Sequence, residues 1–208
     1  MNSKETDMQQ QILQAAEQLV MENGFDATST TDIARKVGCN QALVHYYFRT
    51  KENLLQQIFV KNANAVLDSL EHYPFEGELE DLIRNLVEVY FKILTAHPKI
   101  PFIIISQLIS NDERRMFVRD FIVENDRRRS IYYRFDSVVQ AAVASGKIRP
   151  VRTLDLLINV VSLVVFTFVS LPMYVDWLRK DEQEVKQYLE ERQEEVVRTM
   201  LSSLRPLQ

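Results

Sequence analysis

Cysteine, glycine and proline are all scarce in this sequence. Among its 208 residues Cys39 is the single cysteine, which excludes an internal disulfide and is compatible with a reducing cytoplasm. The first residues form no basic, apolar-cored leader, so we expect a cytoplasmic protein and not a secreted one. Only 4 glycines and 6 prolines are present, and alternating β-branched runs are few. The sequence therefore predicts an all-α chain.

An excess of positive charge is also lacking. The chain is globular in composition, with 46% hydrophobic and 26% charged residues, and its net charge is −4. Residues 1–60 hold five Lys or Arg side chains against seven Asp or Glu. If this part of the chain binds DNA, local placement of cations and helix N-termini must supply the attraction in place of bulk charge.

Residue patterns for catalysis or metal binding are absent as well. The histidines, His45, His72 and His97, lie far apart in the sequence, and none neighbours the cysteine. No metal-ligand, nucleophile-elbow or phosphate-loop motif occurs. We therefore expect no catalytic residue, no metal and no cofactor. A small helical enzyme remains as an alternative, which would need titratable side chains brought together by the fold.

Residues 29–53 carry the most specific pattern of the chain. Ser29 with Asp32 forms a capping box before a first short helix, and Gly38 is the residue that ends it in a left-handed conformation. Asn40 then caps a second short helix, residues 41–48, and Thr50 caps the helix that follows. Two short helices joined by a glycine-containing turn predict a helix-turn-helix.

The second of these helices has an unusual outer face. Val44 and Phe48 share the inward stripe, which leaves two i,i+4 pairs facing outward, Gln41 with His45 and Ala42 with Tyr46. A plain surface helix would show Lys and Glu there. Gln can bond the edge of adenine, Ala or Leu can touch a thymine methyl, and Tyr or His can reach phosphates. We therefore expect this helix to read the DNA major groove.

At these positions the chain resembles the TetR family of one-component transcription regulators. The match extends over about residues 8–60, with departures at Cys39, Ala42 and His45. The residues that carry it are Gly24, Phe25, Thr28, Ser29, Ile33, Ala34, Gly38, Asn40, Val44, Tyr47, Phe48, Lys51, Glu52 and Leu54. The resemblance implies a three-helix head at residues 1–50, joined by a long helix to an effector-binding and dimerisation domain at residues 51–208.

The resemblance also implies phosphate contacts at the two helix starts that flank the reading helix. Lys51 lies in the first turn after Thr50, where a helix N-terminus assists phosphate binding. Thr30 and Thr31 match family residues that touch the DNA backbone. The candidate DNA-binding residues are Thr30, Thr31, Asn40, Gln41, Ala42, Leu43, His45, Tyr46, Tyr47 and Lys51.

Apolar periodicity predicts the remaining helices. Before the helix-turn-helix, residues 8–22 are expected to form an amphipathic helix. Phe25 is expected to pack at the base of the three-helix head. After the helix-turn-helix, the expected helices are 51–71, 79–96, a deeply buried 102–110, a single long 112–145, a buried 153–175 broken by Pro172, and 181–203. Asp181 with Glu184 is expected to cap the last of these. Arg127, Arg128 and Arg129 fan over three sides of the long helix, and one of them is a candidate for meeting an acidic effector.

The family likeness implies a homodimer that binds a palindromic double-stranded operator, usually as a repressor, and is released by a small molecule. The resemblance implies a small effector, apolar or amphipathic. The aromatic residues of the second domain, with a few polar neighbours, could line a pocket for it. Candidate effector-binding residues are Phe91, His97, Phe102, Gln107, Phe121, Tyr132 and Phe166. The last two helices are expected to form the dimer interface, with Val164 and Val165 facing the partner.

The stretch Leu156–Val175 is long enough to cross a membrane, since it has 20 residues without a charge. It also contains Asn159, Ser162 and Pro172 and lacks an adjacent basic flank. A helix buried on most sides in a core or a subunit interface is therefore the favoured interpretation, with no membrane partner. A membrane-associated helical protein remains the alternative.

Overall fold

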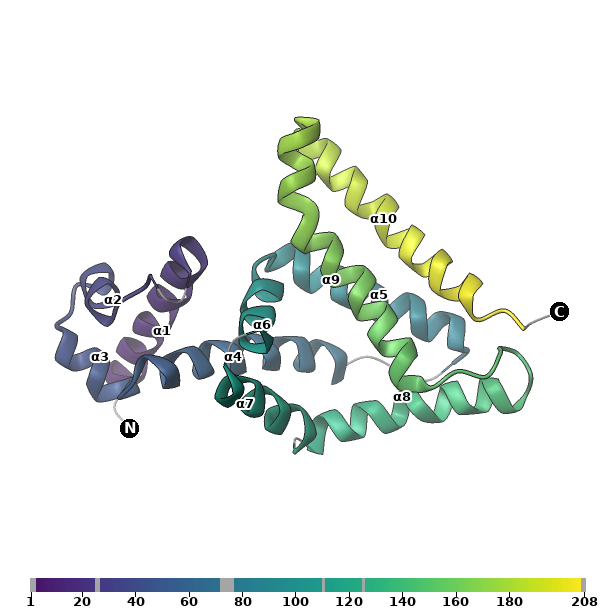
Figure 1. The fold of residues 1–208 in the computed structure, drawn as a ribbon, viewed down its shortest axis with the longest axis horizontal. Coiled ribbons are helices and arrows are strands. Elements are labelled where there is room, and N and C mark those ends of the chain that lie inside the picture. The colour runs from purple at the N-terminus through teal and green to yellow at the C-terminus, as the bar shows by residue number, and fades with distance from the viewer. Residues whose placement is uncertain (1–2, 25–26, 72–76, 110, 125, 207–208) are drawn as a thin grey trace. The chain divides into compact units, whose positions relative to one another are not determined.

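The computed structural model describes residues 3–24, 27–71, 77–109, 111–124 and 126–206. Within these ranges every regular element is an α-helix, which confirms the predicted all-α class. The helices are α1 (Ser3–Asn23), α2 (Thr30–Val37), α3 (Gln41–Phe48), α4 (Lys51–Glu71), α5 (Leu79–Ala96), α6 (Ile100–Leu108), α7 (Asp112–Val123), α8 (Asp126–Ala144), α9 (Thr153–Leu178) and α10 (Glu182–Ser203) (Figure 1).

The chain forms two compact units. Unit 1 comprises residues 1–65 with 102–106, and unit 2 comprises residues 66–101 with 107–208. The helix α4 runs from one unit into the other, so the domain boundary expected at residue 50 stays a prediction.

Unit 1 is built on the predicted helix-turn-helix. The helix α2 packs against both α1 and α3. Ser29 Oγ accepts from Asp32 N at 3.1 Å, and Asp32 accepts in return from Ser29 N at 3.3 Å, so the capping box is confirmed. Gly38 has φ 81°, the left-handed conformation expected at the end of α2. Phe25, expected beneath this unit, lies outside the described residues.

The core of unit 1 is built mainly on α1, α2, α3 and α4. Its buried apolar side chains are Ile12, Ala15, Ala16, Ile33, Ala34, Val44, Phe48, Leu54, Leu55, Ile58, Phe59 and Ala63, with Ile103 of α6. Each fully buried large side chain contributes about 1.5–3 kcal/mol, which exceeds what an eight-residue helix gains from its own hydrogen bonds. The packing of unit 1 therefore holds α2 and α3 in place.

In unit 2 the helix α5 lies against both α9 and α10, which form a hairpin closed by Arg179–Asp181 (Figure 1). The rings of Phe91 and Phe168 meet edge to face at 5.4 Å between centroids, where α5 packs on α9. A second capping box, Asp181 with Glu184, starts α10 as the sequence predicts.

The expected single helix at 112–145 is wrong. It is two helices, because α7 ends at Val123, where Glu124 N donates to Asp120 O at 2.9 Å, and α8 starts anew at Asp126. An acidic residue in the first turn favours a new helix start. Continuous apolar periodicity concealed this interruption.

The expected break at Pro172 is also wrong, because α9 continues to Leu178 with the proline inside it. A proline in a helix interior costs about 3 kcal/mol. Tyr174 and Val175, beyond the proline, share a cavity wall with Val185 and Tyr188 of α10. Packing on α10 therefore holds the last turns of α9 in helical form.

The helix α6 is not deeply buried on every side, as was expected. Ile100, Ile103 and Gln107 are buried, whereas Phe102 and Leu108 are exposed. The buried residues follow an i, i+3, i+7 spacing, so one stripe of this uniformly apolar helix faces the interior. Because α6 is apolar on nearly every side, its sequence does not indicate which side is buried.

The helix α9 has a buried stripe and an exposed one. Leu156, Val160, Val164 and Phe168 are buried within the subunit, with Val164 at 0% exposure. Val164 therefore lies in the core of its own chain and does not face a partner, contrary to expectation. The exposed stripe, named here the α9 stripe, consists of Leu154, Ile158, Phe166, Met173 and Trp177.

The same helix, Thr153–Leu178, is long and apolar enough to cross a membrane, with a mean hydropathy of 2.3 over its most apolar window. One third of that window, 33%, is buried inside the subunit. The sequence predicts that α9 is buried on most sides, but within one chain it is not.

Replacing Ser29 by Ala removes the hydroxyl that caps α2, and we expect the free energy of unfolding to fall by about 1 kcal/mol. Chemical denaturation followed by circular dichroism measures this change. Thr31→Ala, at an exposed position of the same helix, is the matched control and should change stability by less than about 0.5 kcal/mol. Equal losses in the two variants would contradict a capping role for Ser29.

Candidate nucleic-acid interface

The outer face of α3 carries uncharged side chains, as the sequence predicts. Val44 and Phe48 are both 1% exposed, whereas Tyr46 is 71% exposed. Gln41, Ala42 and His45 are exposed beside Tyr46. Leu43 and Tyr47 are half-buried at the margins, and the rings of Tyr46 and Tyr47 meet edge to face at 5.2 Å. We name the set Gln41, Ala42, His45 and Tyr46 the reading face.

Both ends of α3 are fixed by local contacts. At the start, Asn40 Oδ1 accepts from Leu43 N at 2.8 Å, which confirms the predicted cap. At the end, Arg49 N donates to His45 O at 2.9 Å, and Arg49 takes a positive φ of 59°. A non-glycine residue in this region is strained, so the turn into α4 is held by its surroundings.

The reading face is tied to α2 by hydrogen bonds. Gln41 Nε2 donates to Thr30 Oγ1 at 2.9 Å and lies 3.5 Å from His45 Nε2. The other ring nitrogen, His45 Nδ1, lies 3.2 Å from Arg49 O. Thr30, Gln41 and His45, three of the predicted DNA-binding residues, are therefore joined in one network.

Helix N-termini in unit 1 offer anion sites. Thr30 and Thr31 begin α2, and Lys51 begins α4 after the cap Thr50, whose hydroxyl accepts from Asn53 N at 3.0 Å. Unsatisfied N–H groups and the helix dipole favour phosphate at such positions. The residues predicted to touch the DNA backbone thus occupy suitable helix starts.

The cations of unit 1 are partly compensated. Arg35 pairs with Asp32 at 2.9 Å, and Lys36 pairs with Glu22 at 3.5 Å. Hydrogen bonds from Ser29 hold the pKa of the Asp32 carboxyl below its ordinary value, so this carboxylate stays charged. Arg49, exposed at the end of α3, is a further candidate for phosphate contact that sequence reasoning missed. Its position between the reading face and Lys51 is the signal that was available.

The seven candidate effector-binding residues occupy different environments. Phe91 packs in the core against Phe168, Gln107 is fully buried, and Phe121 and Tyr132 are half-buried. His97, Phe102 and Phe166 are exposed. Phe166 lines a cavity between α9 and α10, whereas the other six residues line neither this cavity nor the one between α5 and α10. Their effector role stays a prediction.

The arginine run at the start of α8 serves several contacts. Arg127 binds Asp68, at 2.7 Å, and Glu71, both near the end of α4, and these hydrogen bonds raise the pKa of its guanidinium. Arg128 turns toward the interior, where its guanidinium lies 3.8 Å from the centre of the Phe121 ring. Burial lowers the pKa of Arg128 to about 10 and raises that of Tyr90, which interacts with it, to about 12.

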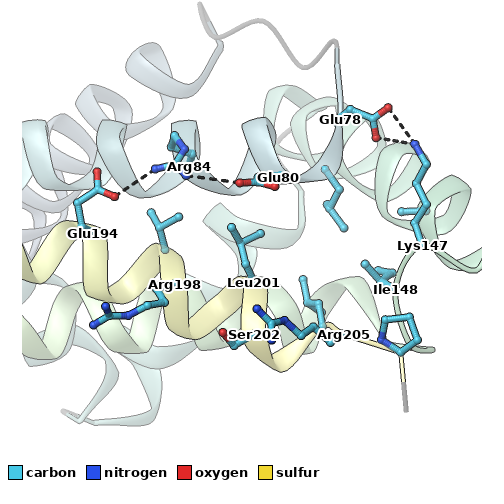
Figure 2. A pocket seen from close by; sticks show the side chains of 15 residues that line it. Glu78, Glu80, Arg84, Lys147, Ile148, Glu194, Arg198, Leu201, Ser202 and Arg205 are labelled. Carbon is cyan, nitrogen blue, oxygen red and sulfur yellow. Dashed lines mark hydrogen bonds and ion pairs between the residues drawn. The ribbon is translucent and has the colours of Figure 1, made fainter. Parts of the chain in front are cut away.

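One cavity of unit 2, of about 590 Å³, lies between the start of α5 and the end of α10 (Figure 2). Several of its charged residues form ion pairs: Arg84 lies between Glu80 at 3.5 Å and Glu194 at 3.2 Å, and Lys147 binds Glu78 at 2.6 Å. The pairs of Arg84 with Glu194 and of Lys147 with Glu78 join segments distant in sequence. Arg198 and Arg205 also line this cavity.

A second cavity, of about 480 Å³, lies between the C-terminal half of α9 and the start of α10. Its walls include Phe166, Leu171, Tyr174 and Val185, and are mostly apolar. Arg192 supplies a polar group, with its Nε donating to Thr167 Oγ1 at 3.1 Å. The cavity adjoins the α9 stripe through Phe166.

A capped helix-turn-helix whose second helix exposes base-reading side chains defines a DNA-binding protein. Residues 12–58 match the family model "Bacterial regulatory proteins, tetR family". The chain is 24% identical over 153 residues, 70% of each sequence, to the uncharacterized HTH-type transcriptional regulator YfiR of Bacillus subtilis (strain 168). Residues 12–58 are thus similar to the DNA-binding domain of the TetR family, and the proteins that the chain resembles are DNA-binding transcriptional regulators, which are not enzymes.

Solved structures share the fold. A bacterial regulatory protein of the TetR family from Rhodococcus RHA1 superposes with a TM-score of 0.73 at 17% identity, covering 100% of both chains. The transcriptional regulator FadR of Bacillus subtilis, in complex with stearoyl-CoA, superposes with a TM-score of 0.68 at 18% identity, covering 94% of this chain and 99% of that one. At these identities the likeness establishes the architecture and not the ligand.

Replacing Gln41 or Tyr46 by Ala removes a side chain from the reading face without opening the core. We expect each variant to bind operator DNA about tenfold more weakly, measured by fluorescence anisotropy, with an unchanged thermal transition and oligomer mass. Gln18→Ala, exposed on α1 in the same unit, is the matched control and should bind like the parent chain. Undiminished affinity in both reading-face variants would exclude this face as the reader.

Proposed function

We propose that this protein is a homodimeric, cytoplasmic repressor that binds a palindromic operator and is released by an amphipathic small molecule. The observation that carries the proposal is the reading face of α3, which exposes Gln41, His45 and Tyr46 in place of charged side chains. A helix face that only meets solvent usually carries charged side chains, whereas the side chains of the reading face can contact base edges and phosphates.

A dimer is supported by the α9 stripe. The α9 stripe recurs at intervals of four, seven or eight residues, so its members line one side of the helix: Leu154, Ile158, Phe166, Met173 and Trp177. A row of large exposed apolar side chains of this kind favours contact with another protein surface over solvent. In a two-fold dimer the same stripe would meet its own copy. Two reading faces would then occupy half-sites about 34–36 Å apart, one turn of DNA.

The ion pairs of Arg127 support a route from effector to DNA. Asp68 and Glu71 belong to α4, the helix that continues into unit 1. Arg127 lies in the first turn of α8, and the next residue, Arg128, lies over the ring of Phe121. An effector that displaces Arg128 would disturb the first turn of α8, and with it the ion pairs that Arg127 makes to α4. A coupling of about 1–3 kcal/mol between ligand and operator is typical of such systems.

The class of effector is inferred from a relative. The FadR structure contains stearoyl-CoA, an amphipathic molecule with a long apolar chain and an anionic head. Unit 2 of this protein offers aromatic surface together with the half-buried cation Arg128, which suits the two ends of such a molecule. We therefore propose long-chain acyl thioesters as the first effectors to test.

Selection of bound fragments from a pool of random duplex DNA tests the proposal. We expect a two-fold symmetric sequence to be enriched, and stearoyl-CoA to weaken its binding about fivefold or more, with coenzyme A alone as the control. A pool without any enriched sequence would contradict the regulator proposal. Enrichment that resists stearoyl-CoA would reject only the effector class.

Ile158→Asp and Phe166→Asp place a charge within the α9 stripe, and we expect both to yield monomers in multi-angle light scattering without detergent. Ile109→Asp is the matched control, because Ile109 is 77% exposed but lies outside the stripe. It should leave the parent mass unchanged. Dimers that persist in both stripe variants would remove this interface, and a parent chain soluble only in detergent would favour membrane association.

A further inference from the structure

Gln41 is held by two partners from within its own unit. Its amide nitrogen lies 2.9 Å from Thr30 Oγ1 on α2 and 3.5 Å from His45 Nε2, one turn further along α3. All of these contacts lie at the surface, on the side where DNA is proposed to bind. A surface glutamine normally rotates freely, so two simultaneous partners restrict which end of the amide faces outward.

The tautomer of His45 decides the direction of the second contact. Its Nδ1 lies 3.2 Å from the carbonyl oxygen of Arg49, which can only accept a hydrogen bond. The neutral ring must therefore carry its proton on Nδ1, and Nε2 is left as an acceptor. The Gln41 amide group then donates one hydrogen to Thr30 and the other to His45. Both of its donors are used, and Oε1 remains for a ligand.

We propose that Thr30 and His45 are positioning residues that make Gln41 present its carbonyl oxygen to the major groove, so that Gln41 selects a base with an amino group there. Adenine offers N6 and cytosine offers N4 in that groove, whereas guanine and thymine offer carbonyl oxygens. This inference rests on the proposed function, because it requires α3 to lie in the major groove.

The arrangement differs from the usual contact of glutamine with adenine, in which both the amide nitrogen and the oxygen engage the base. Here the nitrogen is held by the protein, so the preference is for any amino-bearing base in place of adenine alone. A single neutral hydrogen bond supports discrimination of about fivefold to tenfold.

A phosphate-contacting role for Thr30 can be distinguished from a positioning role by its effect on DNA affinity. A side chain that only touches phosphate weakens binding to all sequences alike and lowers the salt dependence. A positioning residue instead changes the ratio of affinities between two duplexes that differ at one base pair. That ratio separates the two roles.

The test uses the full chain and the operator obtained by selection. Gln41→Ala first identifies the base pair that Gln41 reads, as the position at which the variant loses preference. At that position the parent should favour an amino-bearing base over a carbonyl-bearing one by about fivefold to tenfold in fluorescence anisotropy. Thr30→Val, which removes the hydroxyl at nearly constant shape, and His45→Phe, which removes both ring nitrogens, should each reduce the ratio to about two or less.

Thr30→Ser retains the hydroxyl and should restore the preference lost in Thr30→Val. Thermal denaturation of each variant should match the parent chain, since exposed hydrogen bonds contribute little to stability. Ratios that stay at the parent value in both Thr30→Val and His45→Phe would overturn the inference while leaving the regulator intact, as would a parental preference for a carbonyl-bearing base. Failure of the parent chain to bind any duplex would overturn both this inference and the proposed function.

Discussion

The burial of Val44 and Phe48 is the constraint on which the DNA-binding surface depends. A helix of eight residues is too short to be stable alone, so α3 exists because these two side chains pack into the core of unit 1. Their i,i+4 spacing also sets the rotation of the helix. Once they face inward, Gln41, His45 and Tyr46 have no alternative but to face outward, and the caps at Asn40 and Arg49 hold both ends in register.

The net negative charge of the protein limits how its DNA-binding surface can attract phosphate. Several cations of unit 1, such as Arg35 and Lys36, are engaged by carboxylates, so little bulk positive charge is available. Attraction to phosphate is left to the starts of α2 and α4, with Lys51 and Arg49 beside the reading face. In a dimer each of these contacts would occur twice, which compensates for the modest charge of a single head.

Unit 2 separates two tasks along its helices. One side of α9 packs on its own chain through Leu156, Val160 and Val164, while the α9 stripe remains exposed. At the start of α8, neighbouring arginines serve different contacts, since Arg127 binds the carboxylates of α4 and Arg128 lies against Phe121. Assembly and ligand response are thus proposed for different surfaces of the same unit, and a change in one need not disrupt the other.

The sequence by itself determined the features that depend on near neighbours along the chain. The capping boxes at Ser29 and Asp181, the left-handed Gly38 and the outward face of α3 are set within one or two helical turns, and all were predicted correctly. Only the tertiary structure decided which side of α6 or α9 is buried, that Pro172 lies inside a helix, and that Arg84 joins Glu194 across 110 positions of sequence. The reason is that burial and ion pairing depend on which segments meet in space, and a uniformly apolar helix does not specify which of its sides will meet another.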